Sequence, residues 1–371
     1  MKYSRKWSLL RALWSGAPKN HWPAFITLDV TPHCNLTCIG CRFHSPLLRE
    51  RPSGEETAPV MPLALLQRLV SDLAPQEMHY FVEGSGEPFV HPQILELLTL
   101  LKARPSLVTL FTNGTLIDAA MAERLIAIQV DVLRFSLFAA GEASFRKNYA
   151  GSDPGHFVRI QENIRRLRAA RQEKAAAKPL LQLFFPVNRT NRDEVDAAIE
   201  LAAACGCDGI TFGRFVELGE KVAGLALDTV ERKQLGRELR GKKSALKRHS
   251  LTHTIARDVV MQESGPETWQ HAPCLITWFH VRIRGNGDVL PCCRCAYPLG
   301  NLHEQSFREI WHGERLREFR RRAAAPDGAA WLKEQGAQCH DCPHIPEMIK
   351  LHRIQRIVSR LRNFLPLNRA D

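Results

Sequence analysis

The sequence has no run of about 18 apolar residues, and this absence excludes a membrane-spanning helix. It also has no internal repeat and no low-complexity segment, so a solenoid or fibrous architecture is not indicated. The first residues begin like a secretory signal, but Arg11 interrupts the apolar stretch and no small-residue cleavage site follows. With 44% hydrophobic and 24% charged residues, we expect an ordinary globular protein located in the cytoplasm.

No helix-turn-helix, RNA-recognition or zinc-finger signature occurs, which argues against nucleic acid as a partner. The chain is nevertheless basic, with 51 Lys and Arg against 39 Asp and Glu and a net charge of +12. Much of the excess lies in amphipathic segments at the two ends, 1–24 and 346–371. As a hypothesis, both ends make peripheral contact with the anionic inner membrane; the alternative is that the C-terminal helix packs on the rest of the chain.

From residue 25 to about 213, short β-rich runs alternate with longer amphipathic stretches. We expect strands at 25–30, 78–83, 107–112, 132–137, 180–187 and 209–212. Strands joined by helices imply a parallel sheet with right-handed crossovers. Because about 190 residues are too few for eight such units, we expect an α/β fold with a partial (β/α)6 TIM-like barrel over 25–240.

The amino-acid composition changes after Pro273, where Gly, Pro and Cys become frequent. A linker is expected at 241–270. A small Cys-rich domain is expected at 271–345, with a β-hairpin that turns near Gly285 and Gly287, followed by helices.

Eleven cysteines in a cytoplasmic chain need an explanation other than disulfides, because thiols stay reduced there. Three lie within 34–41 and six within 274–342, and such clustering is typical of metal ligands. Cys205 and Cys207 are isolated and poorly spaced for chelation, so we expect them in the core.

The first cysteine set, Cys34, Cys38 and Cys41, directly follows the first expected strand, at the edge where barrel enzymes keep their chemistry. Three soft thiolates at this spacing suit an iron–sulfur cluster. Three ligands for four irons leave one iron open to another molecule. The alternative is a structural zinc site completed by His33 or His44.

The spacing of three and then two residues between these cysteines resembles the signature of the radical S-adenosylmethionine (SAM) superfamily. The resemblance implies that the open iron binds SAM and that an electron, supplied by a flavodoxin or ferredoxin, cleaves it to a 5′-deoxyadenosyl radical. The radical would then abstract a hydrogen atom from a substrate. One departure is Gly40, where the family often has an aromatic residue that contacts adenine.

Further matches to the family follow successive expected strands. The sequence Gly84-Ser-Gly-Glu-Pro88 resembles the Gly-Gly-Glu-Pro segment that binds the SAM amino group, and its glycines let backbone approach a ligand. The SAM-contacting residues implied by the resemblance are Ser85, Gly86, Glu87, Pro88, Asn113, Ser136 and Asn188. No catalytic acid or base is assigned.

The second cysteine set resembles the SPASM/twitch module that follows the barrel in many members. This resemblance implies one auxiliary [4Fe–4S] cluster, with ligands Cys274, Cys292, Cys339 and Cys342. A closed four-cysteine zinc site is the alternative. Cys293 could exchange roles with Cys292. We expect Cys293 and Cys295 at packing or loop positions, the alternative being contact with the substrate or the cluster.

The sequence therefore predicts a radical SAM oxidoreductase acting on an unidentified substrate. About 24 residues precede the barrel, too few for a peptide-binding domain, which favours oxidation of a small-molecule or lipid-linked substrate. The alternatives are a maturase of ribosomal peptides or proteins, an RNA-modifying enzyme, and a non-catalytic scaffold with two structural metal sites.

Overall fold

The computed structural model describes residues 22–47, 59–73, 78–215, 224–265, 268, 273–339 and 342–364. All six expected strands of the barrel are present, within two residues of their expected ends. The strands are β1 (Phe25–Asp29), β2 (Met78–Glu83), β3 (Ser106–Thr112), β4 (Val132–Ser136), β5 (Leu180–Val187), β6 (Gly209–Arg214), β7 (Thr252–His253), β8 (His280–Arg284), β9 (Asp288–Leu290) and β10 (Gly300–Asn301).

The helices cover one side of this sheet and build the C-terminal region. Those of the barrel are α2 (Leu63–Asp72), η1 (Pro88–Val90), α3 (Ile94–Lys102), α4 (Ala119–Ile128), α5 (Glu142–Asn148), α6 (His156–Glu173), η2 (Arg192–Glu194), α7 (Val195–Ala204), α9 (Thr229–Gly241), α10 (Lys243–Arg248) and α11 (Ile255–Glu263). Those of the C-terminal region are η3 (Ile276–Trp278), α13 (Phe307–His312), α14 (Glu314–Ala323), α15 (Gly328–Glu334) and α16 (Ile345–Phe364).

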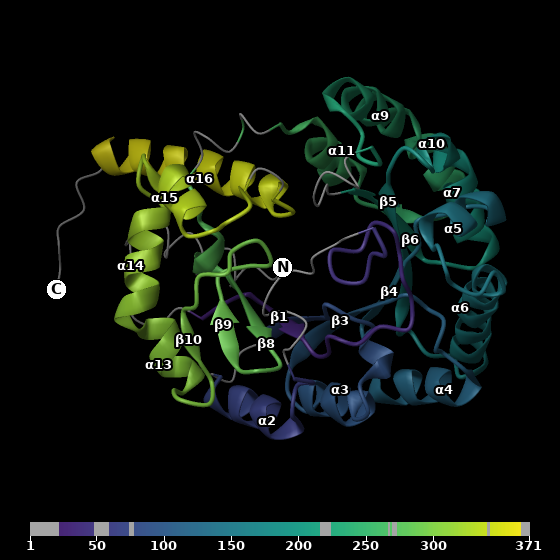
Figure 1. Cartoon of the computed structure of the whole chain (residues 1–371), viewed down its shortest axis with the longest axis horizontal. Helices are drawn as coiled ribbons and strands as arrows, with labels where there is room; N and C mark the ends of the chain where they lie inside the picture. Colours follow the sequence, from purple (N-terminus) through teal and green to yellow (C-terminus); the bar gives the residue numbers. More distant parts are fainter. Residues whose placement is uncertain are drawn as a thin grey trace.

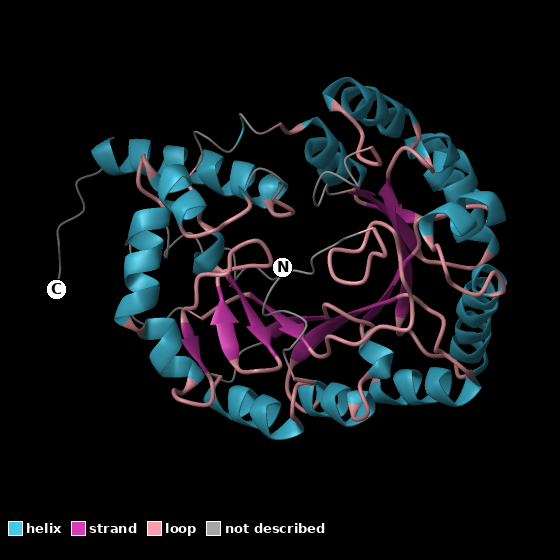
Figure 2. Ribbon diagram, in the orientation of Figure 1, coloured by secondary structure: helices cyan, strands magenta, loops and turns pink. Residues whose placement is uncertain are grey.

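One ten-stranded sheet runs through the molecule in the order β10-β9-β8-β1-β2-β3-β4-β5-β6-β7. The strands from β8 through β1 to β7 pair in parallel, and β9 and β10 add antiparallel pairs. The sheet curves into an open arc with helices outside it (Figures 1 and 2). The expected partial α/β barrel is therefore confirmed.

Two features go beyond the sequence expectation. The stretch 241–270, expected as a linker, contains α10, β7 and α11, and β7 extends the parallel sheet beside β6. The expected hairpin is formed by β8 and β9, but it is not a separate layer. Because β8 pairs with β1, the Cys-rich region continues the barrel sheet.

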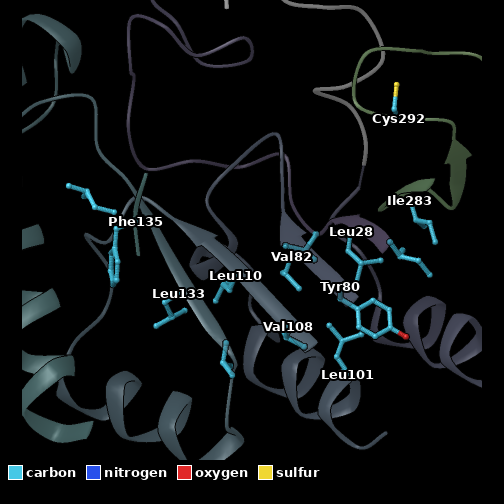
Figure 3. Close-up of a cluster of buried hydrophobic side chains, with 14 of the residues drawn as sticks. Leu28, Tyr80, Val82, Leu101, Val108, Leu110, Leu133, Phe135, Ile283 and Cys292 are labelled. Atoms are coloured by element: carbon cyan, nitrogen blue, oxygen red, sulfur yellow. The ribbon is translucent and has the colours of Figure 1, made fainter. Parts of the chain in front are cut away.

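The strands present alternating faces to the helices and to the inside of the arc. In β2, Met78, Tyr80 and Val82 are buried, whereas His79, Phe81 and Glu83 are only partly buried. Figure 3 shows Tyr80 and Val82 among side chains from neighbouring strands and α3. Removing each such side chain from water stabilises the fold by about 1.5–3 kcal/mol. The concave face carries both aromatic and polar side chains, such as Phe81 and Glu83.

Local signals explain the main helices. In α3, Ile94, Leu97, Leu98 and Leu101 recur at helical spacing and are the residues it buries. The N-terminus of α9 is closed by Asp228, whose Oδ1 accepts backbone hydrogen bonds from residues 230 and 231 at 2.8 and 2.9 Å.

The first turns of α16 pack against the rest of the chain: Ile345, Met348 and Leu351 are buried, and Arg257 on α11 pairs with Glu347 at 2.9 Å. Packing of the C-terminal helix is thus observed at its start. The membrane hypothesis concerns 1–24 and 346–371, of which 1–21 and 365–371 lie outside the described residues. None of the described helices is long and apolar enough to cross a bilayer.

Candidate functional site

The first cysteine set lies in the loop after β1, on the inside of the arc (purple in Figure 1). All three cysteines are partly buried. Two backbone N–H groups, of Phe43 and His44, donate hydrogen bonds to the Cys41 sulfur at 3.4 and 3.3 Å. Such donors stabilise a metal-bound thiolate.

The thiols of this set influence one another. Burial, with smaller contributions from Glu87 and Cys41, raises the pKa of Cys34 to about 11. Burial, followed by Cys41 and Cys34, raises the pKa of Cys38 well above its usual range. Without metal the thiols therefore stay protonated. Iron binding would deprotonate them and replace mutual repulsion by coordination, so the donor set fits a cluster.

The Gly84–Pro88 segment is locked to the start of the cysteine loop. The Gly86 N–H donates to the Thr31 carbonyl oxygen at 3.0 Å, and the Glu87 N–H donates to the His33 carbonyl oxygen at 2.8 Å. A Cβ on Gly86 would lie 1.9 Å from the His33 carbonyl oxygen. Only glycine therefore permits this contact between the two segments.

Glu87 organises the edge of the sheet beside this contact. Its buried carboxylate accepts hydrogen bonds from Thr112 Oγ1 at 2.8 Å and from the Asn113 backbone N–H at 2.6 Å. Burial raises the pKa of Glu87 to about 7. The Asn113 side chain reaches the cysteine loop, where its Nδ2 donates to Asn35 Oδ1 at 2.9 Å. Pro88 begins η1 directly behind Glu87.

Ser85 and Ser136 occupy positions suited to a ligand at the same edge. Ser85 lines a small pocket with Asp29, Thr31 and Arg284. Ser136 ends β4 and is partly buried.

Asn188, which the resemblance places in contact with SAM, lies in the turn after β5. Its side chain is 0% exposed. Its Nδ2 donates to Asn148 Oδ1 at 2.7 Å, and its Oδ1 accepts from the backbone and hydroxyl of Thr190 at 2.8 and 2.7 Å. With its amide held inside the turn after β5, Asn188 fits a structural role better than a ligand contact.

The structure also explains the departure at Gly40. A Cβ at this position would lie 2.1 Å from the ring of Phe215. Phe215 directly follows β6, and its ring packs edge-on against Phe138. An aromatic residue from the far end of the barrel therefore occupies the space that a side chain at position 40 would fill. No pattern near Gly40 in the sequence points to Phe215.

The second cysteine set converges at the other side of the molecule. Cys274, Cys292, Cys339 and Cys342 line one pocket together with Arg294 and His344. The loops that carry them are joined by hydrogen bonds, including the Gln338 N–H to the Arg294 carbonyl oxygen at 2.8 Å. The pKa of Cys274 is raised to about 11 by burial. Four thiols facing one pocket suit a closed cluster site.

The remaining cysteines separate into two kinds. Cys205 and Cys207 are 2% and 8% exposed within the hydrophobic core, as expected. Cys293 lies near Glu83 and Arg282 on the barrel strands, and Cys295 lies near Cys274 and Cys339. Among the described residues, no three His, Cys, Asp or Glu side chains are grouped so as to hold a single metal ion.

A row of five polar residues and one phenylalanine crosses the concave face two residues before the expected SAM contacts. By strand register it runs through Arg284, Asp29, Glu83, Phe111, Arg134 and Gln182. Three of these residues precede Ser85, Asn113 and Ser136 by two positions. They therefore lie on the same face, about 7 Å deeper along the strands.

Asp29 of this row forms an ion pair with Arg282 of β8, whereas Glu83 and Arg134 take no part in that pair. Among the described residues, the side chain of Glu83 makes no hydrogen bond or ion pair, and burial, together with Asp29, raises its pKa to about 7. Arg134 donates to Gln182 Oε1 at 2.8 Å and stacks 5.0 Å from the Phe111 ring centre. Strongly perturbed groups in such a position are candidates for function. The sequence placed Glu83 only near a strand end.

Two family models match the chain. The radical SAM superfamily model matches residues 28–202, and the iron–sulfur cluster-binding SPASM domain model matches residues 274–343.

Curated relatives match most of the chain at low identity. The cofactor-modifying protein of the tungsten-containing aldehyde ferredoxin oxidoreductase from Pyrococcus furiosus is 23% identical, covering 80% of this chain and 83% of its own. The AdoMet-dependent heme synthase of Methanosarcina barkeri is 26% identical and covers 86% and 91%. The PqqA peptide cyclase of Streptomyces rochei is 26% identical and covers 86% and 82%.

Solved structures show the same fold at 16% identity. Native anSMEcpe with bound AdoMet gives a TM-score of 0.62 over 92% of this chain and 98% of its own. Streptococcus suis SuiB bound to S-adenosylmethionine gives 0.61 over 81% and 68%. From the motifs, the fold and both family models, the chain belongs to the radical SAM superfamily and carries a C-terminal SPASM-type iron–sulfur module.

Proposed function

We propose that Cys34, Cys38 and Cys41 hold the SAM-binding [4Fe–4S] cluster of this enzyme, and that its substrate lies on the concave face of the barrel. The observation that carries the proposal is the contact between Gly86 and the His33 backbone, because it fixes the glycine segment directly beside the cysteine loop. When bound, the cluster supplies the electron that cleaves SAM to a 5′-deoxyadenosyl radical.

The residues of this chain would orient the cosubstrate. The Gly84–Pro88 segment presents backbone to it, Asn113 joins that edge to the cysteine loop, and Ser136 offers a hydroxyl from β4. Phe215 provides the aromatic surface that position 40 lacks. Asn188 holds the turn after β5.

The second part of the proposal concerns the auxiliary cluster, held by Cys274, Cys292, Cys339 and Cys342. Cys293, next in sequence to Cys292, lies near Glu83 and Arg282 on the concave face. A substrate resting on Glu83 and Arg134 would therefore lie between the SAM-binding edge and the auxiliary site. This placement supports an oxidation in which the auxiliary cluster accepts an electron, with a flavodoxin or ferredoxin as the reductant of the first cluster.

Two substrate classes agree with this placement. A ribosomal peptide is supported by the similarity to a PqqA peptide cyclase, which spans 86% of this chain. A small molecule or lipid-linked compound is supported by the equally broad similarity to a heme synthase. In either class, the two side chains favour a substrate that carries a hydrogen-bond donor for the Glu83 carboxyl and an anionic group for the Arg134 guanidinium.

Anaerobic reconstitution tests the first two parts together. Wild-type protein should hold about eight irons per chain, show the EPR signal of reduced clusters and release 5′-deoxyadenosine from SAM after reduction. The Cys34→Ala/Cys38→Ala/Cys41→Ala variant should keep about four irons and release none. Release at the wild-type rate by this variant would refute the assignment of the first cluster.

Comparison of cell extracts separates the two substrate classes. Reconstituted enzyme is incubated with SAM and either the peptide fraction or the small-molecule and lipid fractions of the native cell. The fraction that contains the substrate should raise 5′-deoxyadenosine release and show a mass loss of two hydrogens in one component. The Glu83→Gln variant is the matched control and should respond less to the same fraction.

A further inference from the structure

A fifth thiol, that of Cys295, lies beside the auxiliary site. Cys292 and Cys295 face each other in an isolated antiparallel β-bridge. Residues directly opposed in such a bridge point their side chains to the same side, with Cβ atoms about 4.5–5.5 Å apart. Both residues are buried, with 7% and 5% of their surface exposed. The bridge therefore places Cys295 beside Cys292, which lines the pocket.

The neighbours of Cys295 agree with this direction. Its thiol interacts electrostatically with the thiols of Cys274, Cys292 and Cys339. These are three of the four residues assigned to the cluster. Cys295 therefore lies within reach of three ligand thiols, and like Cys292 it is buried against the hydrophobic core.

Cys295 also resembles the assigned ligands in the backbone group that acts on its thiol. The sulfur of Cys292 accepts the N–H of Arg294, and that of Cys342 accepts the N–H of His344, each at 3.4 Å. In both cases the donor is two residues after the cysteine. At Cys295 the backbone N–H of Tyr297, again two residues later, opposes the rise in the pKa of the thiol that burial causes. Such a donor stabilises negative charge on a cluster-bound sulfur.

We propose that the auxiliary cluster is held by Cys274, Cys339, Cys342 and either one of two interchangeable thiols, Cys292 or Cys295. This inference rests on the proposed function, because it assumes the auxiliary cluster. A four-iron cluster takes four thiolates, so one of the five stays protonated. In the exchange, one iron–sulfur bond forms as the other breaks, and the proton passes from the incoming to the outgoing sulfur. No electron is transferred.

The turn between the two thiols also carries Cys293, which faces Glu83 and Arg282. The interchangeable corner is therefore the part of the auxiliary site next to the proposed substrate. An exchange of ligands there changes the donor arrangement around one iron without opening the cluster to solvent.

Iron content tests the proposal without any substrate. The variants are made in the Cys34→Ala/Cys38→Ala/Cys41→Ala background, so that only the auxiliary cluster is counted. We expect about four irons in that background, and about four again when Cys292→Ala or Cys295→Ala is added. Adding both should bring the iron close to zero. The two single variants should give different EPR spectra when reduced, because the ligand differs.

Two further variants serve as controls, and circular dichroism monitors folding in every case. Cys205→Ala removes a core cysteine and should leave about four irons, whereas Cys274→Ala should leave almost none. Loss of the iron in Cys292→Ala alone or in Cys295→Ala alone would overturn the interchange, as would full iron content in the double variant. Full iron in Cys274→Ala, or none in the background itself, would instead refute the auxiliary assignment on which the inference rests.

Discussion

Replacing Gly86 by Ala should separate the two segments that form the SAM-binding edge. The added Cβ would meet the His33 carbonyl oxygen at 1.9 Å, and its other near contacts are also backbone atoms of His33. An ordinary contact begins at 3.4 Å, so the segments must move apart by about 1.5 Å. No side-chain rotation relieves this contact.

The size of the effect follows from the bonds that such a movement breaks. The hydrogen bonds from Gly86 to Thr31 and from Glu87 to His33 are 3.0 and 2.8 Å long, and both would exceed hydrogen-bonding length. At about 1–2 kcal/mol for each, the loss is about 2–4 kcal/mol. If SAM binds only the joined arrangement, its dissociation constant should rise by at least about 30-fold.

A graded set of glycine variants provides the assay. Gly84→Ala places a Cβ 2.7 Å from the Thr31 carbonyl oxygen and should have a smaller effect. Gly241→Ala, with nothing within 4 Å, is the matched control and should bind SAM like wild type. SAM binding is measured by equilibrium dialysis on reconstituted protein with iron content checked. A Gly86→Ala variant that is folded and binds SAM within threefold of wild type would refute the reasoning.

Three other changes have defined outcomes. Gly40→Phe and Phe215→Ala should each lower the melting temperature. The double variant should recover part of the loss, because the ring at position 40 then fills the space that Phe215 leaves; a decrease equal to the sum of the two single decreases would contradict this. Glu83 has its pKa raised from 4.5 to about 7, so its ionisation costs stability progressively between about pH 4.5 and 7 and by a constant amount above that. Glu83→Gln should be more stable than wild type by about 1–3 kcal/mol at pH 8, and the difference should vanish near pH 4 in urea titrations. Asp131, paired with Lys102 at 2.7 Å, has a lowered pKa; its stabilisation is present at neutral pH and lost as pH falls below about 4, so Asp131→Asn should lose about 2 kcal/mol at pH 7 and less near pH 3.

The sequence alone was sufficient for the barrel and for the first cysteine set. Strand and helix positions follow from hydrophobic periodicity, which is local, and the observed strands lie within two residues of the expected ones. Cysteine spacing is equally local, because three thiols within eight residues reach one cluster however the rest of the chain folds. For the second set, two sequence-distant pieces had to be combined by resemblance, and the structure brings all four thiols to one pocket.

Other features depended on contacts between residues far apart in the chain. Strand register and the curvature of the sheet produce three such features. They are the pairing of β8 with β1, the contact of the Phe215 ring with Gly40, and the row that contains Glu83 and Arg134. Asn188 shows the converse, since its position after a strand favoured a ligand contact and its tertiary hydrogen bonds hold it inside a turn. Local pattern determined which residues form the elements and the ligands, whereas tertiary packing decided which of them face one another, because side-chain direction across a sheet is set only when the strands pair.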